Sequence, residues 1–153
     1  MSPYPIEPAR AAGPMRLVIT TYPSRESATE AVESALHAGL AACANIVSAQ
    51  SRFWWEGRVE SADESLVLFK TTPKRVGALF RHLEANHPYD VPEVAEVDVP
   101  RVGSAYLRYL AATLDPGSLP PPMGGGPTRR GARRARGARA LARTRAPHHH
   151  RSR

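Results

Sequence analysis

The chain has 153 residues, of which 42% are apolar, and it carries a formal net charge of +7. That charge is unevenly placed, because the ten arginines after Asp115 have no acidic residue among them. Residues 1–115 hold 11 Lys and Arg against 14 Asp and Glu, so this part is mildly acidic. The balance argues against a basic nucleic-acid surface on the folded part, because such a surface needs an excess of positive charge there.

Residue usage also excludes several classes of protein. Cys43 is the single cysteine, so neither an intrachain disulfide nor a cysteine-based zinc cluster can form, which suits a reducing cytosol. A run of 18 apolar residues, the minimum for a membrane-spanning helix, is missing. Residues 1–14 are rich in Pro and Ala and lack the apolar core of a secretory signal, so they predict a flexible extension. We therefore expect a cytoplasmic protein.

The first predicted elements are a strand and a helix. Residues 15–21 form a short β-branched run that ends at Tyr22-Pro23, which is typical of a buried strand. Ser24 is the expected N-cap of the helix, and apolar residues then repeat at helical spacing up to Leu36. Gly39 follows as a natural stop signal, because glycine tolerates the left-handed conformation that ends many helices.

A long hairpin comes next. Two β-rich stretches, 42–55 and 58–71, flank a Glu56-Gly57 turn, and each exceeds the ~5–6 residues of a typical strand. Its tip carries Phe53, Trp54 and Trp55, which are too many large apolar groups for a solvated turn. We expect this overhanging edge to pair with another chain. The alternative is that both indoles fold back onto their own core.

The second half repeats the alternation of helix and strand. Thr72 is the expected cap of a helix with Pro73 in its first position, and this helix ends before Pro88. Residues 91–99 then predict a fourth strand, and a final helix starts at Ser104. The order β-α-β-β-α-β with a terminal helix predicts an α+β, ferredoxin-like domain over residues 15–115. Both crossovers contain a helix, as parallel neighbouring strands would require.

The composition changes sharply after Asp115. Residues 116–153 are rich in Pro, Gly and Arg and contain too few apolar groups to offset the entropy of ordering them, so we predict a disordered tail. Its arginines could bind phosphate backbones without sequence preference, and the His tract 148–150 could hold a transition metal weakly.

Several local motifs occur together and in a fixed order, namely Leu40–Ile46, Trp54–Gly57, Lys70–Thr72, His87–Glu93 and Tyr106-Leu107. With these motifs in register, the sequence resembles the CutA family of divalent-cation tolerance proteins. The resemblance implies a ferredoxin-like protomer, a tight homotrimer similar to the PII signalling proteins, and ligand sites in clefts between subunits. It also implies a role in tolerance of copper and other divalent metals.

The resemblance further implies site residues. Trp55, Lys70, Tyr89 and Glu93 match positions of the intersubunit cleft. One cation, one carboxylate and two aromatic side chains would suit a small anionic or zwitterionic ligand. For Lys70 the alternative is a solvated charge at the end of a strand.

A copper site is the second implied feature. In the family it uses a cysteine near the end of the first strand and a His pair before a proline; here Thr20 and Asn86 replace two of these ligands and His87 remains. A lone imidazole without a thiolate is a poor copper site, so we expect weak binding of copper or another divalent metal, shared with a carboxylate such as Glu93. The alternative is that His87 only caps the preceding helix.

Catalysis is not expected. The sequence contains neither a nucleophile elbow nor a phosphate-binding glycine loop, and Cys43 lies among alanines that would not activate a thiol. The leading hypothesis is a non-enzymatic, trimeric metal-response or small-ligand module. One alternative is a nucleic-acid or anionic-surface binding protein that acts through the Arg-rich tail. Another is a small enzyme built around Cys43 and His87.

Overall fold

The computed structural model describes residues 12–118, so the predictions for residues 1–11 and for the tail beyond 118 lie outside the described residues. The described part has the following elements: β1 (Met15–Tyr22), α1 (Arg25–His37), β2 (Cys43–Trp55), β3 (Arg58–Thr71), α2 (Val76–Ala85), β4 (Val94–Val99), α3 (Ser104–Leu114) and the 3-10 turn η1 (Pro116–Ser118). Across these residues, no helix has the length and hydropathy needed to cross a membrane.

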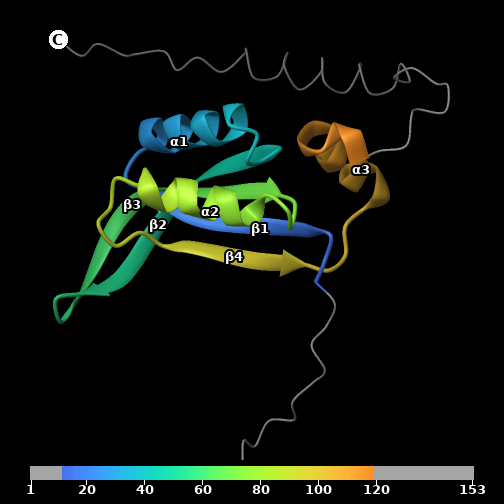
Figure 1. The fold of residues 1–153 in the computed structure, drawn as a ribbon. Helices are drawn as coiled ribbons and strands as arrows, with labels where there is room; N and C mark the ends of the chain where they lie inside the picture. Colours follow the sequence, from blue (N-terminus) through green and yellow to red (C-terminus); the bar gives the residue numbers. More distant parts are fainter. Residues whose placement is uncertain (1–11, 119–153) are drawn as a thin grey trace, which may run out of the picture. The chain divides into compact units, whose positions relative to one another are not determined.

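The strands form one sheet in the order β2-β3-β1-β4 (Figure 1). Every neighbouring pair is antiparallel, with Val18 opposite Phe69 on β3 and opposite Glu96 on β4. This arrangement confirms the ferredoxin-like fold. The expectation of parallel neighbours was wrong, because β3 inserts between β1 and β2, the two strands that α1 connects in parallel.

Alternation along β1 gives the sheet a different partner on each face. Val18 and Tyr22 belong to the main core, which α1 and α2 cover from one side (Figure 1). Met15 and Leu17 point the other way and join a second cluster with Leu110 and the rest of α3. The helices of the two crossovers, α1 and α2, therefore share one face, and α3 packs on part of the opposite face.

Local signals in the first half behave as predicted. The Ser24 hydroxyl accepts a hydrogen bond from the Ser27 amide at 3.1 Å, which confirms the N-cap of α1. Gly39 has a φ of +69°, as a glycine stop requires. Glu56 and Gly57 both have positive φ (47° and 78°), the conformation that two-residue hairpin turns favour.

Two boundaries in the second half differ from the prediction. The helix α2 begins at Val76 rather than Pro73, because the Thr72 carbonyl first accepts the Arg75 amide in a tight turn and then the Val76 amide. The Thr72 hydroxyl caps nothing. Strand β4 begins at Val94 rather than Val91, since Pro92 has no N–H to donate to a ladder.

The segment before β1 is attached to β4. The Gly13 amide donates to the Asp98 carboxylate at 2.8 Å, and its carbonyl accepts from the Arg16 guanidinium at 2.7 Å. A Cβ atom at Gly13 would lie 2.2 Å from the carbonyl oxygen of Val99, so only glycine fits this approach.

We therefore expect Gly13→Ala to lower the free energy of unfolding by about 1–3 kcal/mol, the usual cost of forcing extra atoms into a packed site. Guanidinium unfolding of the two proteins measures the difference. Gly117→Ala is the matched control, because a Cβ there meets no atom within 4 Å. Equal losses in both variants would show that the contact of residue 13 with β4 does not matter.

Candidate functional site around His87

His87 lies just after α2 and packs against two tyrosines. Its ring stacks on Tyr22, with centroids 4.5 Å apart and planes 17° apart, and it lies 5.3 Å from the ring of Tyr89. Tyr22 ends β1 and is 1% exposed, so the stack rests on the main core. The core therefore fixes the plane of the imidazole.

Both nitrogens of this imidazole have partners. The Tyr89 amide donates to Nδ1 at 3.1 Å, so Nδ1 is an acceptor. In the neutral ring the proton then lies on Nε2, which donates to the hydroxyl of the fully buried Thr20 at 3.1 Å. The structure thus brings together His87 and the strand residue at the position of the family's cysteine.

Glu64 completes the cluster, although the sequence analysis gave it no role. The Tyr89 hydroxyl donates to its Oε2 at 2.7 Å. Burial acts to raise the pKa of Glu64, but hydrogen bonds from Ser51, Tyr89 and Thr21 outweigh it and lower the pKa. Burial, together with the Glu64 carboxylate, raises the pKa of Tyr89 to about 12. The carboxylate is therefore the ionised member of the cluster at neutral pH.

Burial lowers the pKa of His87, although a backbone contact with Thr21 and the charge of Glu64 oppose the shift. Protonation would also remove the Nδ1 lone pair that accepts the Tyr89 amide. The cluster therefore holds the imidazole in its neutral form.

The predicted cleft residues do not meet within one chain. Trp55 pairs with Arg58 at the tip of the hairpin, whereas Lys70 pairs with Cys43 at its other end, ~40 Å away along the strand. Tyr89 contacts Glu64 between these ends, and Glu93 is exposed just before β4. A site that contains all four predicted residues therefore needs more than one subunit, and their role stays a prediction.

The donor set of a single chain does not fit a closed metal site. Among residues 12–118, no three His, Cys, Asp or Glu side chains gather around a point where an ion could bind. Thr20 already accepts from His87, and the Asn86 amide donates to the carbonyl of His82 at 2.8 Å. A metal at His87 would have to replace one of the two hydrogen bonds of the ring.

Cys43 has a more polar environment than its sequence neighbours suggest. Its sulfur lies 2.7 Å from the hydroxyl of Tyr106 on α3, and Lys70 is its direct partner in the ladder. Burial and the Cys43 thiol raise the pKa of Tyr106 above its usual value. The predicted inertness of Cys43 stays a prediction.

The stability of the fold should depend on pH through His87. In the unfolded chain a histidine titrates near 6.5, and in the folded chain the pKa of His87 is lower. The contribution of the neutral His87 ring to the free energy of unfolding is therefore fully present above about pH 6.5. It is lost as the pH falls from there toward the pKa of His87 in the folded chain. Glu64 loses its contribution only in the more acidic range of carboxyl groups, because its own pKa is lowered.

Guanidinium unfolding between about pH 7.5 and pH 5 measures this effect. We expect His87→Gln to flatten the decline that the parent protein shows. His37→Gln is the matched control, because that imidazole is exposed at the end of α1. An unchanged decline in His87→Gln would rule out His87 as its source.

Comparison with known proteins agrees with the fold. The model of the CutA1 divalent ion tolerance protein family matches residues 16–113. The divalent-cation tolerance protein CutA of Pyrococcus horikoshii is 38% identical over 96 residues, which cover 63% of this chain and 94% of that protein. The chloroplastic protein CutA 1 of rice is 39% identical over 98 residues, which cover 63% of this chain and 55% of the rice protein.

The solved structure of CutA from Synechococcus elongatus superposes with a TM-score of 0.65 at 33% identity, and the match covers 67% of this chain and 92% of that one. The family match spans the whole ferredoxin-like domain, including β1 and the His87 cluster. The chain belongs to the CutA1 divalent ion tolerance family.

Proposed function

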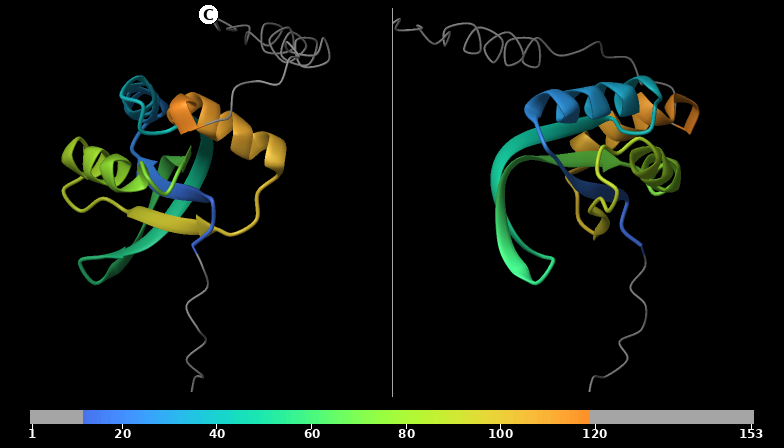
Figure 2. Two further views of the ribbon diagram at one scale, coloured as in Figure 1. Left: turned by 45° about the vertical axis from the view of Figure 1, so that its right-hand side comes forward. Right: turned by 90° about the vertical axis from the view of Figure 1, so that its left-hand side faces the viewer.

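We propose that this chain is a divalent-cation tolerance protein that acts as a homotrimer, binds a small ligand between its subunits and catalyses no reaction. Family membership supports the tolerance role, and the names of the relatives describe tolerance rather than a reaction. The observation that carries the trimer is the hairpin of β2 and β3, which extends well beyond the rest of the sheet (Figure 2).

The overhanging part of the hairpin lacks a partner in one chain. Strand β1 pairs with β3 only from Ser65 to Thr71, so Arg58–Glu64 has β2 as its single neighbour among the described strands. A two-stranded ribbon is at best marginally stable in water. Its tip is also apolar, with Trp54 75% and Trp55 54% exposed. A second subunit that covers the tip would bury the tryptophans and would also support the two-stranded ribbon.

The sheet offers a further surface for the same partner. Val47 on β2 and Val97 on β4 are exposed. By strand alternation and register they share the side of Leu17, opposite the face that α1 and α2 cover. Apolar residues at both edges of this face, together with the tip, suit a subunit that wraps around its neighbours.

Assembly also explains how the predicted ligand site would form. In one chain, Trp55 and Lys70 lie at opposite ends of the hairpin, so the tip of one subunit has to reach the Lys70 end of another. We place a small anionic or zwitterionic ligand there, with Lys70 as its cation and Trp55, Tyr89 and Glu93 around it. This arrangement follows the resemblance of these residues to the family's cleft positions.

Changing Trp54 and Trp55 together to Ser should weaken the trimer. Burial of an aromatic side chain contributes roughly 1.5–3 kcal/mol, and the contact repeats at each interface. Light scattering over a dilution series should therefore show the variant dissociating at a concentration at least tenfold higher than the parent. Arg52→Ser is the control, since it changes an exposed polar residue on the same strand. Identical dissociation of parent and double variant would disprove the interface.

We further propose that a divalent metal such as copper binds weakly at His87, because the ring must give up a hydrogen bond to Thr20 or to the Tyr89 amide. The affinity should fall as the pH drops through the imidazole pKa, since a protonated ring cannot bind a metal.

Titration with Cu²⁺ by calorimetry tests this proposal in a protein whose tail histidines, His148, His149 and His150, are changed to Ala. In that background His87→Ala should lower the Cu²⁺ affinity several-fold, and His37→Ala should leave it unchanged. Equal Cu²⁺ affinities with and without the His87 imidazole would refute this proposal.

Two further proposals concern the Arg-rich tail, which lies outside the described residues, and the location of the protein in the cell. The Arg-rich tail remains the basis of the alternative function, non-specific binding of nucleic acid or an anionic surface, because its ten arginines have no acidic neighbours. A cytoplasmic location is likewise proposed from the single free cysteine, Cys43.

A further inference from the structure

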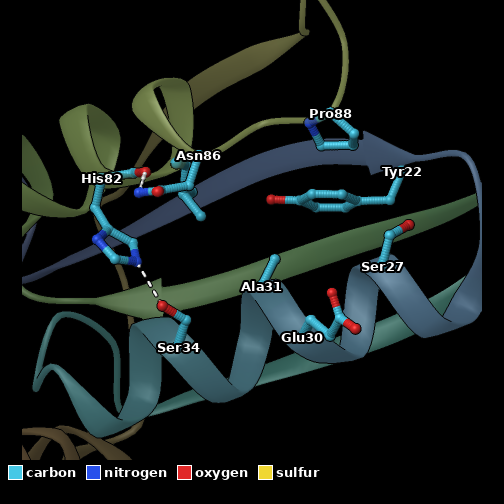
Figure 3. A pocket seen from close by; sticks show the side chains of 9 residues that line it. Tyr22, Ser27, Glu30, Ala31, Ser34, His82, Asn86 and Pro88 are labelled. Atoms are coloured by element: carbon cyan, nitrogen blue, oxygen red, sulfur yellow. Dashed lines mark hydrogen bonds between the residues drawn. The ribbon is translucent and has the colours of Figure 1, made fainter.

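A pocket lies between α1 and α2, on the face of the sheet that these helices cover (Figure 3). Its volume is about 290 Å³, room for about ten water molecules at ~30 Å³ each. It is lined by Tyr22, Ser27, Glu30, Ala31, Ser34, His82, Leu83, Asn86 and Pro88. None of the predicted site residues is among them.

The sequence of α1 creates this pocket. Ser27, Ala31 and Ser34 lie at i, i+4 and i+7, so they form one stripe of the helix, and that stripe faces α2. Larger apolar residues in this stripe would fill the space between the two helices. These small side chains leave a space over Tyr22 and Leu83 instead.

The polar groups around this space are one carboxylate and several side chains that can both donate and accept hydrogen bonds. The Glu30 carboxylate points toward the pocket and has no hydrogen-bond or ion-pair partner among residues 12–118 (Figure 3). The Asn86 side chain donates one N–H to the carbonyl of His82 at 2.8 Å, and its oxygen is an acceptor beside the pocket. The Ser34 hydroxyl and Nε2 of His82 form a hydrogen bond of 2.9 Å across the pocket.

The charge of the lining decides the kind of ligand. Among the described residues neither Lys nor Arg lines the pocket, and the exposed Glu30 gives its rim one negative charge. Ala31 and Pro88 supply the accessible part of an apolar floor for methylene groups, above the almost fully buried Tyr22 and Leu83. We propose that this pocket binds a small aliphatic ammonium compound, whose charged nitrogen pairs with Glu30 and whose carbon chain lies over the apolar floor.

Two other uses of the same residues fit less well. Ser34 and His82 resemble a nucleophile and its base, but Ser34 lies inside α1, where the neighbouring amides bond within the helix and cannot form an oxyanion hole. A metal would find only His82 and Glu30 as strong ligands, and no three His, Cys, Asp or Glu groups converge in the described residues. Ammonium binding needs neither feature.

This pocket lies away from the residues proposed for the trimer interface. The exposed Val47 and Val97 share the opposite face of the sheet, and the hairpin tip belongs to neither helix. The ligand chemistry also differs, because the cleft between subunits has Lys70 as its cation and the α1–α2 pocket has Glu30 as its anion.

Saturation-transfer NMR on the full-length protein tests the proposal with three four-carbon probes: 1,4-diaminobutane, butane-1,4-diol and succinate. We expect transfer to the diamine, with a dissociation constant in the millimolar range, and none to the diol or to succinate. The three probes match in length, so the charge of the end groups is the variable. Diol or succinate binding as tight as that of the diamine would overturn the assignment of charge.

Variants locate the site. Glu30→Gln should weaken diamine binding about fivefold, as expected for loss of one partly exposed charge pair. Glu33→Gln, the same change on the same helix but outside the lining, should have less than about a twofold effect. Ala31→Met should fill the pocket and abolish saturation transfer. Equal effects of the two Glu variants, or no transfer from the parent protein at about 10 mM diamine, would refute the proposal.

Discussion

The main constraint on this structure is the length of β2 and β3, which extend beyond the strands that flank them within one chain. Strands β2 and β3 pair over their full length, but β1 stops at Tyr22, opposite Ser65. Beyond this point the ribbon has two strands, exposed backbone edges and two exposed indoles. Such a ribbon is stable when another chain completes it. The lengths of the strands are therefore the feature on which the proposed assembly and its ligand cleft rest.

The end of β1 is also where the chemistry of the fold concentrates. Tyr22 supports the His87 ring on one side and lines the α1–α2 pocket on the other, so one buried side chain is common to both. Thr20 bonds Nε2 of His87, and Glu64 accepts from the Tyr89 hydroxyl, so both contact the loop after α2. Both regions therefore depend on the same core and each has a carboxylate, Glu64 bonded to Tyr89 in one and the exposed Glu30 in the other.

Features set by neighbours in the chain could be predicted from the sequence. The cap at Ser24, the stop at Gly39 and the turn at Gly57 each depend on one residue's own conformational preferences, and the order of elements followed from them. Features that depend on strand pairing or on contacts between distant residues could not be predicted in this way. Lys70 lies opposite Cys43 only through the register of β2 and β3, and Glu64 meets Tyr89 only because β1 ends beside it. The stripe of three small side chains on α1, Ser27, Ala31 and Ser34, is visible in the sequence, but it becomes a pocket only when α2 lies across it.

The central claim is that the overhanging hairpin is completed by other copies of the chain. Native mass spectrometry of the full-length protein, sprayed from micromolar solution at neutral pH, measures this directly. The account predicts one dominant species with three times the mass of the 16.6 kDa chain, and little free monomer. A spectrum dominated by the monomer would contradict it, because the exposed tryptophans and the two-stranded ribbon would then have to be stable in water.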